Sequence, residues 1–176
     1  MRQINVDGLL FSFADDQWIV TKYDAWKFYR NRWARMWNDI KAVDLLAVDL
    51  DRTGWLIEVK DYTRMGHDED VRPEAIDLAL VVAHKVFDTL AAMLPAKVNS
   101  RDDHERKFAS SMVRTKRLRV VLHLEQPATR TRLRPRAIDP ANIRQKLKQL
   151  LKPIDPHPAV VAINQMGGLG WEVIRP

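Results

Sequence analysis

The chain has 176 residues, which suits one domain with a hydrophobic core, and its 46% hydrophobic and 30% charged residues exclude an intrinsically disordered protein. The net charge of +6 and the pI near 9.7 favour a polyanionic partner, nucleic acid ahead of membrane. The absence of cysteine excludes disulfides and thiolate metal sites. The same absence fits a reducing cytoplasm, and no membrane contact is expected, because no apolar run is long enough to cross a bilayer and no signal peptide is recognisable.

Apolar periodicity predicts an α/β protein in which strands and helices alternate along a single domain, 1–176. The predicted elements, in chain order, are strands at 9–13 and 17–21, a helix at 24–37, strands at 42–50 and 55–62, helices at 73–94 and 102–113, a strand at 118–124, a helix at 140–151 and strands at 159–163 and 171–174. The first two strands, around a turn at 14–16, predict a hairpin. We expect a core at about 20–125 and an extension at 139–176.

Two of these helices carry apolar side chains at helical spacing. In the helix at 24–37 the aromatic residues, interpreted as core packing, are Trp26, Tyr29, Trp33 and Trp37. Asp24 is placed to cap this helix. In the helix that Pro73 opens and Pro95 ends, the predicted core side consists of Ile76, Leu80, Val81, His84, Phe87 and Leu90. His84 is therefore expected to be a buried core histidine.

The most informative segment is the second predicted hairpin, 42–62, in which Asp44, Glu58 and Lys60 lie among apolar residues. Charged side chains with apolar neighbours on both faces of a strand are costly unless they are paired or bind something. Glu58 and Lys60 are two residues apart and point to the same face. A three-residue loop that ends with Gly54 in the left-handed conformation adds Asp44 to that face, whereas a two-residue loop sends it to the other.

Two carboxylates that lie close together repel each other unless a cation lies between them. Hard oxygen ligands with open water positions suit Mg²⁺ or Mn²⁺, and phosphate oxygens can complete the coordination shell. Such a metal lowers the pKa of a bound water, and Lys60 could orient that water or stabilise the developing anion. The other interpretation is an amphipathic hairpin on which Lys60 pairs with Glu58 or Asp44 in solvent, a contact worth little.

Asp44, followed fourteen residues later by Glu58 and then Lys60, resembles the motif of the PD-(D/E)XK nuclease superfamily, which has the restriction-endonuclease-like fold. The resemblance covers about residues 20–125. It implies a central mixed β-sheet flanked by helices, with core elements in the order α-β-β-β-α-β. It also implies that Asp44 and Glu58 bind Mg²⁺ or Mn²⁺, and that Lys60 assists an endonuclease reaction on DNA.

The resemblance leaves three details open. Val43 stands where the superfamily's name has proline. The third core strand has no obvious candidate after the first helix, and the N-terminal hairpin could supply it from before that helix. In relatives an extra acid from the first helix sometimes joins the metal site, and Asp24 is the candidate for this accessory acid, alongside its interpretation as a helix cap.

A basic stretch at 114–136 is interpreted either as a solvated loop or as a surface that neutralises successive phosphates. The candidate nucleic-acid-binding residues are Arg117, Arg119, Arg130, Arg132, Arg134 and Arg136. The last four alternate along the chain, so an extended conformation would point them the same way. Nothing in this pattern implies that bases are read specifically.

Other motifs say less about function. The acidic cluster at 67–70 predicts a loop, because consecutive residues do not converge well on one ion. Gly167, Gly168 and Gly170 predict a turn, because no helix with a following Lys-Ser/Thr completes a phosphate loop. Two alternatives to the nuclease stay open: an inactive nuclease-like module that binds nucleic acid or a protein partner, and an interaction protein with an acidic partner. A homodimer is also left open, with 159–174 as its interface or as an edge of the core.

Overall fold

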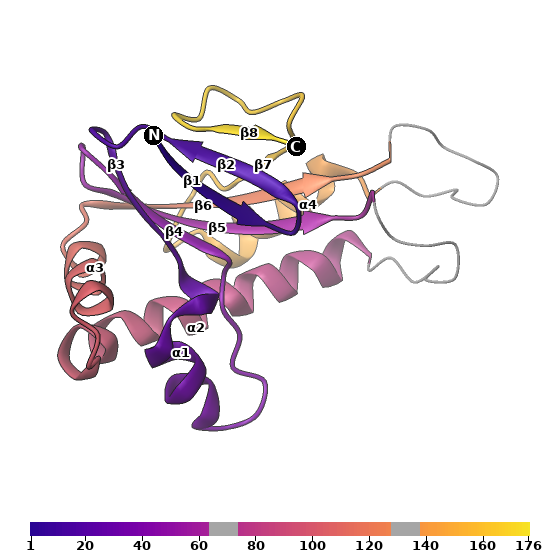
Figure 1. The fold of residues 1–176 in the computed structure, drawn as a ribbon. Coiled ribbons are helices and arrows are strands. Elements are labelled where there is room, and N and C mark those ends of the chain that lie inside the picture. The colour runs from indigo at the N-terminus through magenta and orange to yellow at the C-terminus, as the bar shows by residue number, and fades with distance from the viewer. Residues whose placement is uncertain (64–73, 128–137) are drawn as a thin grey trace.

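A five-stranded mixed sheet forms the centre of the computed structural model, which describes residues 1–63, 74–127 and 138–176. Helices cover one face of this sheet, and a second, three-stranded sheet covers the other, so that the chain is built in three layers (Figure 1). The predicted α/β class and the mixed sheet flanked by helices are therefore confirmed. The acidic cluster at 67–70 and the arginines at 130–136 lie outside the described residues.

The central sheet has the strand order β3-β4-β5-β6-β7. Its strands are β3 (Trp18–Lys22), β4 (Leu45–Asp49), β5 (Thr53–Asp61), β6 (Arg117–Glu125) and β7 (Ala159–Val161). Neighbouring strands from β3 to β5 are antiparallel, and those from β5 to β7 are parallel. Parallel neighbours require a crossover, and the chain makes them through α2 (Ala75–Asn99) and α3 (Asp103–Val113), and then through α4 (Pro140–Leu151).

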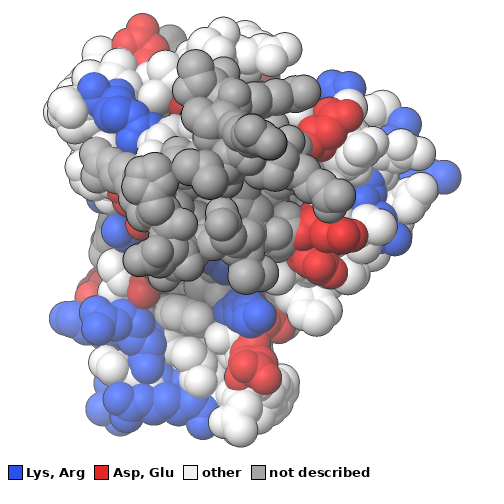
Figure 2. All heavy atoms as spheres, turned by 90° about the vertical axis from the view of Figure 1, so that its right-hand side faces the viewer, with Lys and Arg blue, Asp and Glu red and all other residues white. Residues whose placement is uncertain are grey.

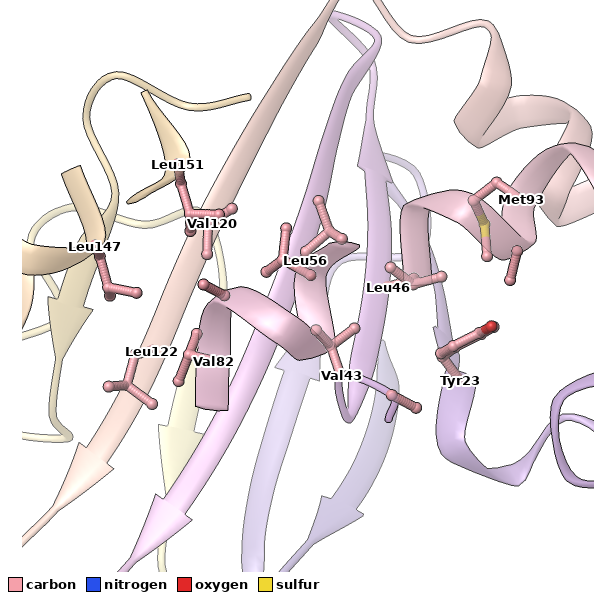
Figure 3. Packing of buried hydrophobic residues seen from close by; sticks show 14 of the residues in the cluster. Tyr23, Val43, Leu46, Leu56, Val82, Met93, Val120, Leu122, Leu147 and Leu151 are labelled. Atoms are coloured by element: carbon pink, nitrogen blue, oxygen red, sulfur yellow. The ribbon is translucent and has the colours of Figure 1, made fainter. Parts of the chain in front are cut away.

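The helical layer buries the even-numbered side chains of β4 to β6. This core is drawn in Figure 3, where the labelled side chains are Tyr23, Val43, Leu46, Leu56, Val82, Met93, Val120, Leu122, Leu147 and Leu151. The residues that α2 presents to the sheet are mostly alanine and valine, among them Ala79, Val82 and Val86. Small side chains let the helix lie close to the strands, and α3 and α4 pack on either side of it.

The second sheet has the order β1-β2-β8 and corrects the first predicted hairpin. It consists of β1 (Arg2–Val6), β2 (Leu9–Phe13) and β8 (Glu172–Ile174). β2 pairs with β1 rather than with β3. The turn between β1 and β2 is Asp7-Gly8, with φ of 51° and 80°, which is the two-residue turn that favours a hairpin. Segment 14–16 instead carries the chain from one sheet to the other.

The outward face of α2 overturns the predicted core side of this helix. Leu80 and Phe87 are 38% and 48% exposed, and His84 is exposed rather than buried. Both faces of the helix are apolar, so periodicity alone could not say which one meets the sheet. Within the described chain, α2 is also apolar enough to cross a membrane by length and composition, with a mean hydropathy of 1.5, although 44% of that window is buried. Core helices of soluble proteins share this property.

Pro95 does not end α2, which continues to Asn99. A proline inside a helix removes one hydrogen bond and disturbs the turn before it. The buried side chains of Met93 and Ala96 keep the last turns of the helix against the rest of the core.

The predicted helix at 24–37 is three short pieces: η1 (Tyr23–Ala25), α1 (Lys27–Asn31) and η2 (Trp33–Arg35). Asp24 does not cap α1. The carboxylate of Glu105 in α3 does so, accepting hydrogen bonds from the backbone N–H groups of Lys27 at 2.6 Å and Phe28 at 3.2 Å. Of the aromatic stripe, Trp26 is buried, whereas Trp37 is 63% exposed.

The later elements are close to their predicted positions. α3 begins after Asp102, whose side chain accepts from the backbone N–H groups of His104 and Glu105, and α4 begins after Asp139, which caps it in the same way. The two late strands do not pair with each other, because β7 joins the central sheet and β8 joins the second sheet.

Candidate active site

The register of β4 and β5 is set by a three-residue loop at 50–52. The predicted loop had this length but lay two residues further along, with Gly54 as the left-handed residue. Arg52 takes that conformation instead, with φ of 60°, and Gly54 pairs with Val48 inside the ladder. Because a shift of two residues in the loop moves each cross-strand partner by an even number, Asp44 stays on the predicted face.

Gly54 is needed for packing rather than for the turn. A Cβ atom at this position would come within 3.1 Å of the side chains of Met112, Thr115 and Leu118. The left-handed Arg52 is held by its own neighbours, since its N–H donates to the carbonyl of Asp49 at 3.0 Å and its carbonyl accepts from Lys116 N–H at 2.8 Å. The close approach of β5 to the α3–β6 connection therefore fixes the register on which the site depends.

Asp44 lies one residue before β4, and extending the ladder by one position puts it opposite Glu58. Its Oδ2 accepts a hydrogen bond of 2.7 Å from the backbone N–H of Val59, at the point where β4 offers no further partner. Its carbonyl oxygen accepts a bond of 2.9 Å from Tyr23 N–H, which joins η1 to the start of β4. Asp44 is thus held at the junction of three segments.

Glu58 is 1% exposed and receives two lysines on one oxygen. Lys85 of α2 donates to Oε1 at 2.6 Å, and Lys60 Nζ lies 3.0 Å from the same atom. The other oxygen, Oε2, is buried and has no hydrogen-bond partner in the described part of the structure. A buried carboxylate oxygen without a partner is costly, and it is an open ligand position.

The electrostatics of this cluster are dominated by burial. The pKa of Glu58 is raised to about 7: burial is the largest cause, the charge of Asp44 adds to the rise, and Lys85 and Lys60 oppose it. Burial lowers the pKa of Lys60, but the charge of Glu58 and its hydrogen bond, together with the charges of Asp44 and Tyr62, leave the pKa above its ordinary value. Glu58 therefore changes its charge near neutral pH, while Lys60 stays protonated.

Asp24 belongs to the same electrostatic neighbourhood. Burial raises its pKa, Lys22 opposes the rise, Asp44 adds to it, and Lys85 opposes it again. Its Oδ1 is buried and, within the described residues, has no hydrogen-bond partner. The capping interpretation of Asp24 is wrong, because Glu105 caps α1, and the interpretation as an accessory acid stays a prediction.

Asp44 and Glu58 are the candidate metal ligands of this cluster. Across residues 1–63, 74–127 and 138–176, no three His, Cys, Asp or Glu side chains are close enough together to hold one ion. Mg²⁺ is commonly bound by one or two carboxylates, with waters and substrate phosphates in the remaining positions. The unpartnered oxygen of Glu58, the facing Asp44 and their mutual repulsion fit a Mg²⁺ or Mn²⁺ ion held by two carboxylates.

Lys85 is the residue that sequence reasoning missed. It lies on α2, 27 residues after Glu58, and no spacing rule links a helix position to a strand residue at that distance. The signal that could have found it is a lysine on the sheet-facing side of an apolar helix, where its side chain is only 16% exposed. A buried lysine usually has a buried acid as partner.

Arg117 and Arg119 do not lie beside the carboxylates. In the ladder with β6, Arg117 pairs with Thr53, whereas Glu58 pairs with Leu122, so the two positions are about 16 Å apart along the strand. Arg119 is occupied elsewhere. Its guanidinium bonds Asp155 Oδ2 at 3.3 Å and the His157 carbonyl at 3.0 Å, and it stacks over Trp55.

Exposed basic residues lie on the segment that leads to Asp44. They are Lys27, Arg30, Arg32 and Arg35, and Asp39 is the only acid between Lys27 and Lys41. Figure 2 shows the side of the molecule where β5 and β6 end, and Lys and Arg side chains gather at its lower end, at the height at which Figure 1 draws α1. Basic charge is therefore available on the same side as the carboxylates.

Comparison with known proteins gives limited similarity. No family model matches the chain, and no solved structure matches it significantly. A cysteine–tRNA ligase of Neisseria meningitidis is 30% identical to it over an alignment of 168 residues, and the match covers 81% of this chain and 24% of the ligase. The chain therefore spans about a quarter of the length of that curated relative, and the class defined here is an α/β protein with a carboxylate–lysine cluster on its sheet.

Proposed function

We propose that the protein is a metal-dependent phosphodiesterase that cuts DNA, with a core of the PD-(D/E)XK kind. The observation that carries this proposal is the convergence of Asp44, Glu58 and Lys60 on one face of β4 and β5. In an ordinary solvated hairpin these side chains would be exposed. Glu58 is instead buried with one oxygen unpartnered, and its pKa lies near 7, which is typical of a functional group.

The topology supports the same proposal. Asp44 directly precedes β4 and Glu58 lies on β5, α2 covers the face that carries them, and β6 then pairs in parallel with β5. That is the order β-β-α-β expected for the second half of such a core. β3 pairs with β4 from before α1, and it is the candidate for the third core strand.

Each side chain has a role that follows from its position. Asp44 and Glu58 would hold Mg²⁺ or Mn²⁺, which when bound supplies Lewis-acid activation of water and phosphate. Lys60, 28% exposed and protonated, reaches from Glu58 toward solvent and would stabilise charge on the phosphate. Lys85 neutralises Glu58 from the helix side and keeps its pKa from rising further.

Substrate binding is assigned to the basic segment around α1. Its exposed arginines can contact phosphates, and the ring of Trp37 is exposed enough to stack on an unpaired base. The similarity to part of a tRNA ligase is a reason to include tRNA among the substrates tested, beside duplex and single-stranded DNA.

The experiment is a cleavage assay on supercoiled plasmid, single-stranded DNA and tRNA, with Mg²⁺, Mn²⁺ or EDTA. We expect metal-dependent cleavage of DNA, lowered at least ~100-fold by Asp44→Asn and by Lys60→Ala. Matched controls are Asp51→Asn in the exposed loop and Lys148→Ala on the exposed side of α4, which should cleave like the unmodified chain.

Other results would replace the proposal. Binding of DNA without cleavage in either metal would identify an inactive module. Cleavage of tRNA alone would change the substrate class. A chain without DNA affinity at low salt would favour an acidic protein partner, because phosphate contacts are strongest under that condition.

A further inference from the structure

The outer face of α2 carries an exposed strip along the whole helix that is apolar except at His84. Its members, all exposed, are Ile76, Leu80, His84, Phe87, Ala91, Leu94 and Val98. Ile76, Leu94 and Val98 are more than half exposed, at 52%, 58% and 66%. After the first step of four, the strip follows a repeat of four and three residues, which is the spacing of a coiled-coil seam.

None of the other elements described in 1–63, 74–127 and 138–176 covers this strip. The inner side of the helix meets the sheet, and α3 and α4 contact it from the flanks. Asp88 and Thr89, on a further side, accept hydrogen bonds from the backbone N–H groups of Lys41 and Val43. An exposed apolar strip about 33 Å long is larger than the scattered apolar residues of an ordinary monomer surface and marks an interaction site.

We propose that a second copy of this chain covers the strip, with the two α2 helices antiparallel about a two-fold axis at Phe87. In that arrangement, residues equally far from Phe87 meet. Leu80 and Leu94 are each seven positions away, and Ile76 and Val98 are each eleven positions away. His84 lies three positions before Phe87 and Ala91 four positions after it, so His84 comes near the small Ala91 of the other copy without facing it directly. The strip is therefore complementary to itself, which an isologous interface requires.

Opposite charges at the two ends of α2 favour pairing with a second copy of the chain, and favour the antiparallel direction. Asp77 in the first turn and Lys97 in the last turn are each ten positions from Phe87. An antiparallel pair brings Asp77 of each copy to Lys97 of the other. A parallel pair would set like charges against each other at both ends, which is unfavourable.

The proposal is independent of the nuclease activity, since Glu58, Lys60 and Lys85 lie on the sheet side of α2. The dimer can therefore be disproved without affecting the proposed nuclease activity, and the reverse also holds. The chain without cysteine offers a direct test of geometry, because single cysteines can be introduced without a background of other thiols.

The first test is oxidative cross-linking of single-cysteine variants. Phe87→Cys lies at the two-fold axis and should form a disulfide-linked dimer. Ile76→Cys lies on the same exposed strip, but its two copies would be about 33 Å apart and should not cross-link. Gln145→Cys on α4 is the control for random collision. Cross-linking of Ile76→Cys as fast as Phe87→Cys would overturn the antiparallel arrangement.

The second test is sedimentation equilibrium of the whole chain, with circular dichroism to check that each variant is folded. We expect a dimer that Phe87→Glu weakens at least ~30-fold. Asp77→Lys and Lys97→Asp should each weaken it by about threefold, and the double variant should restore it. A chain that remains monomeric up to ~100 µM overturns the proposal, as does a monomer that binds lipid vesicles through this face.

Discussion

Two buried acids of the central sheet, Asp155 and Glu58, have different surroundings. Asp155, before β7, is 1% exposed and has every oxygen in use: Oδ2 bonds Arg119 and the Val120 N–H at 2.8 Å, and Oδ1 bonds the His157 N–H at 2.8 Å. Glu58 is equally buried, but both of its lysine partners meet one oxygen. Only the second of these acids has an oxygen to offer to a ligand.

This difference suggests a structural role for Asp155 and a functional role for Glu58. Asp155 ties the α4–β7 connection to β6 through backbone N–H groups, which are donors of fixed direction. Glu58 meets long side chains and the charge of Asp44, and its pKa rises to about 7. Incomplete satisfaction together with a perturbed pKa is what a functional site is expected to show.

The largest expected effect is on cleavage. Glu58→Gln removes a metal ligand and should lower the rate by about 1,000-fold or more, whereas Asp155→Asn should cleave at nearly the unmodified rate under conditions in which it is folded. Plasmid nicking measured for both variants checks this difference. Similar losses in the two variants would contradict the separation of roles.

For stability the order of the two variants should be reversed, with the larger loss in Asp155→Asn. Since the pKa of Glu58 is raised from 4.5 to about 7 in the folded protein, its contribution to the unfolding free energy is full below about 4.5 and is lost as pH rises through about 7. At pH near 8, Glu58→Gln should therefore leave this free energy unchanged or raise it by ~1 kcal/mol. Asp155→Asn puts an NH₂ group against N–H donors and should lower it by about 2–4 kcal/mol.

Urea denaturation of both variants measures these changes. A Glu58→Gln variant that loses as much stability as Asp155→Asn would show that Glu58 is a structural anchor as well.

The affinity for metal should depend on pH through Glu58. The carboxyl must lose its proton to bind a cation, so the Mg²⁺ affinity should rise about tenfold per pH unit below about 7 and level off above it. Isothermal titration between pH 5.5 and pH 8 follows this change. In metal-free protein, Asp44→Asn should lower the pKa of Glu58, because the charge of Asp44 is one of its causes, and ¹³C NMR of the carboxyl group can detect the shift.

The smallest expected effect concerns DNA affinity at the two ends of the sheet. Arg30→Gln combined with Arg35→Gln should weaken DNA binding several-fold and reduce the number of ions released on binding, read from the slope of log affinity against log salt, by about two. Arg117→Gln should change both quantities little. Arg144→Gln on exposed α4 is the control. Fluorescence anisotropy at several salt concentrations checks this, and a larger loss with Arg117→Gln would move the binding surface to the other end.

The face shared by Asp44, Glu58 and Lys60 could be predicted because strand periodicity is strict. The loop was predicted two residues too far along the chain. Because that shift moves each cross-strand partner by an even number of residues, Asp44 remained on the predicted face. Lys85 could not be predicted, since its contact depends on how a helix crosses the sheet. The side of α2 that faces the sheet was predicted wrongly for a related reason. Both sides of the helix are apolar, and the side with the smaller side chains packs against the strands.

The cap that Glu105 provides for α1 has a consequence for how the basic segment can be used. Glu105 is buried, its Oε2 also accepts from Ser100 Oγ at 2.7 Å, and it lies 78 residues from the N–H of Lys27 that it holds. A helix of five residues is too short to form alone. The proposed nucleic-acid-binding segment is therefore not a transferable module: a peptide of residues 22–43 should be unstructured, and a chain cut before α3 should lose this surface first.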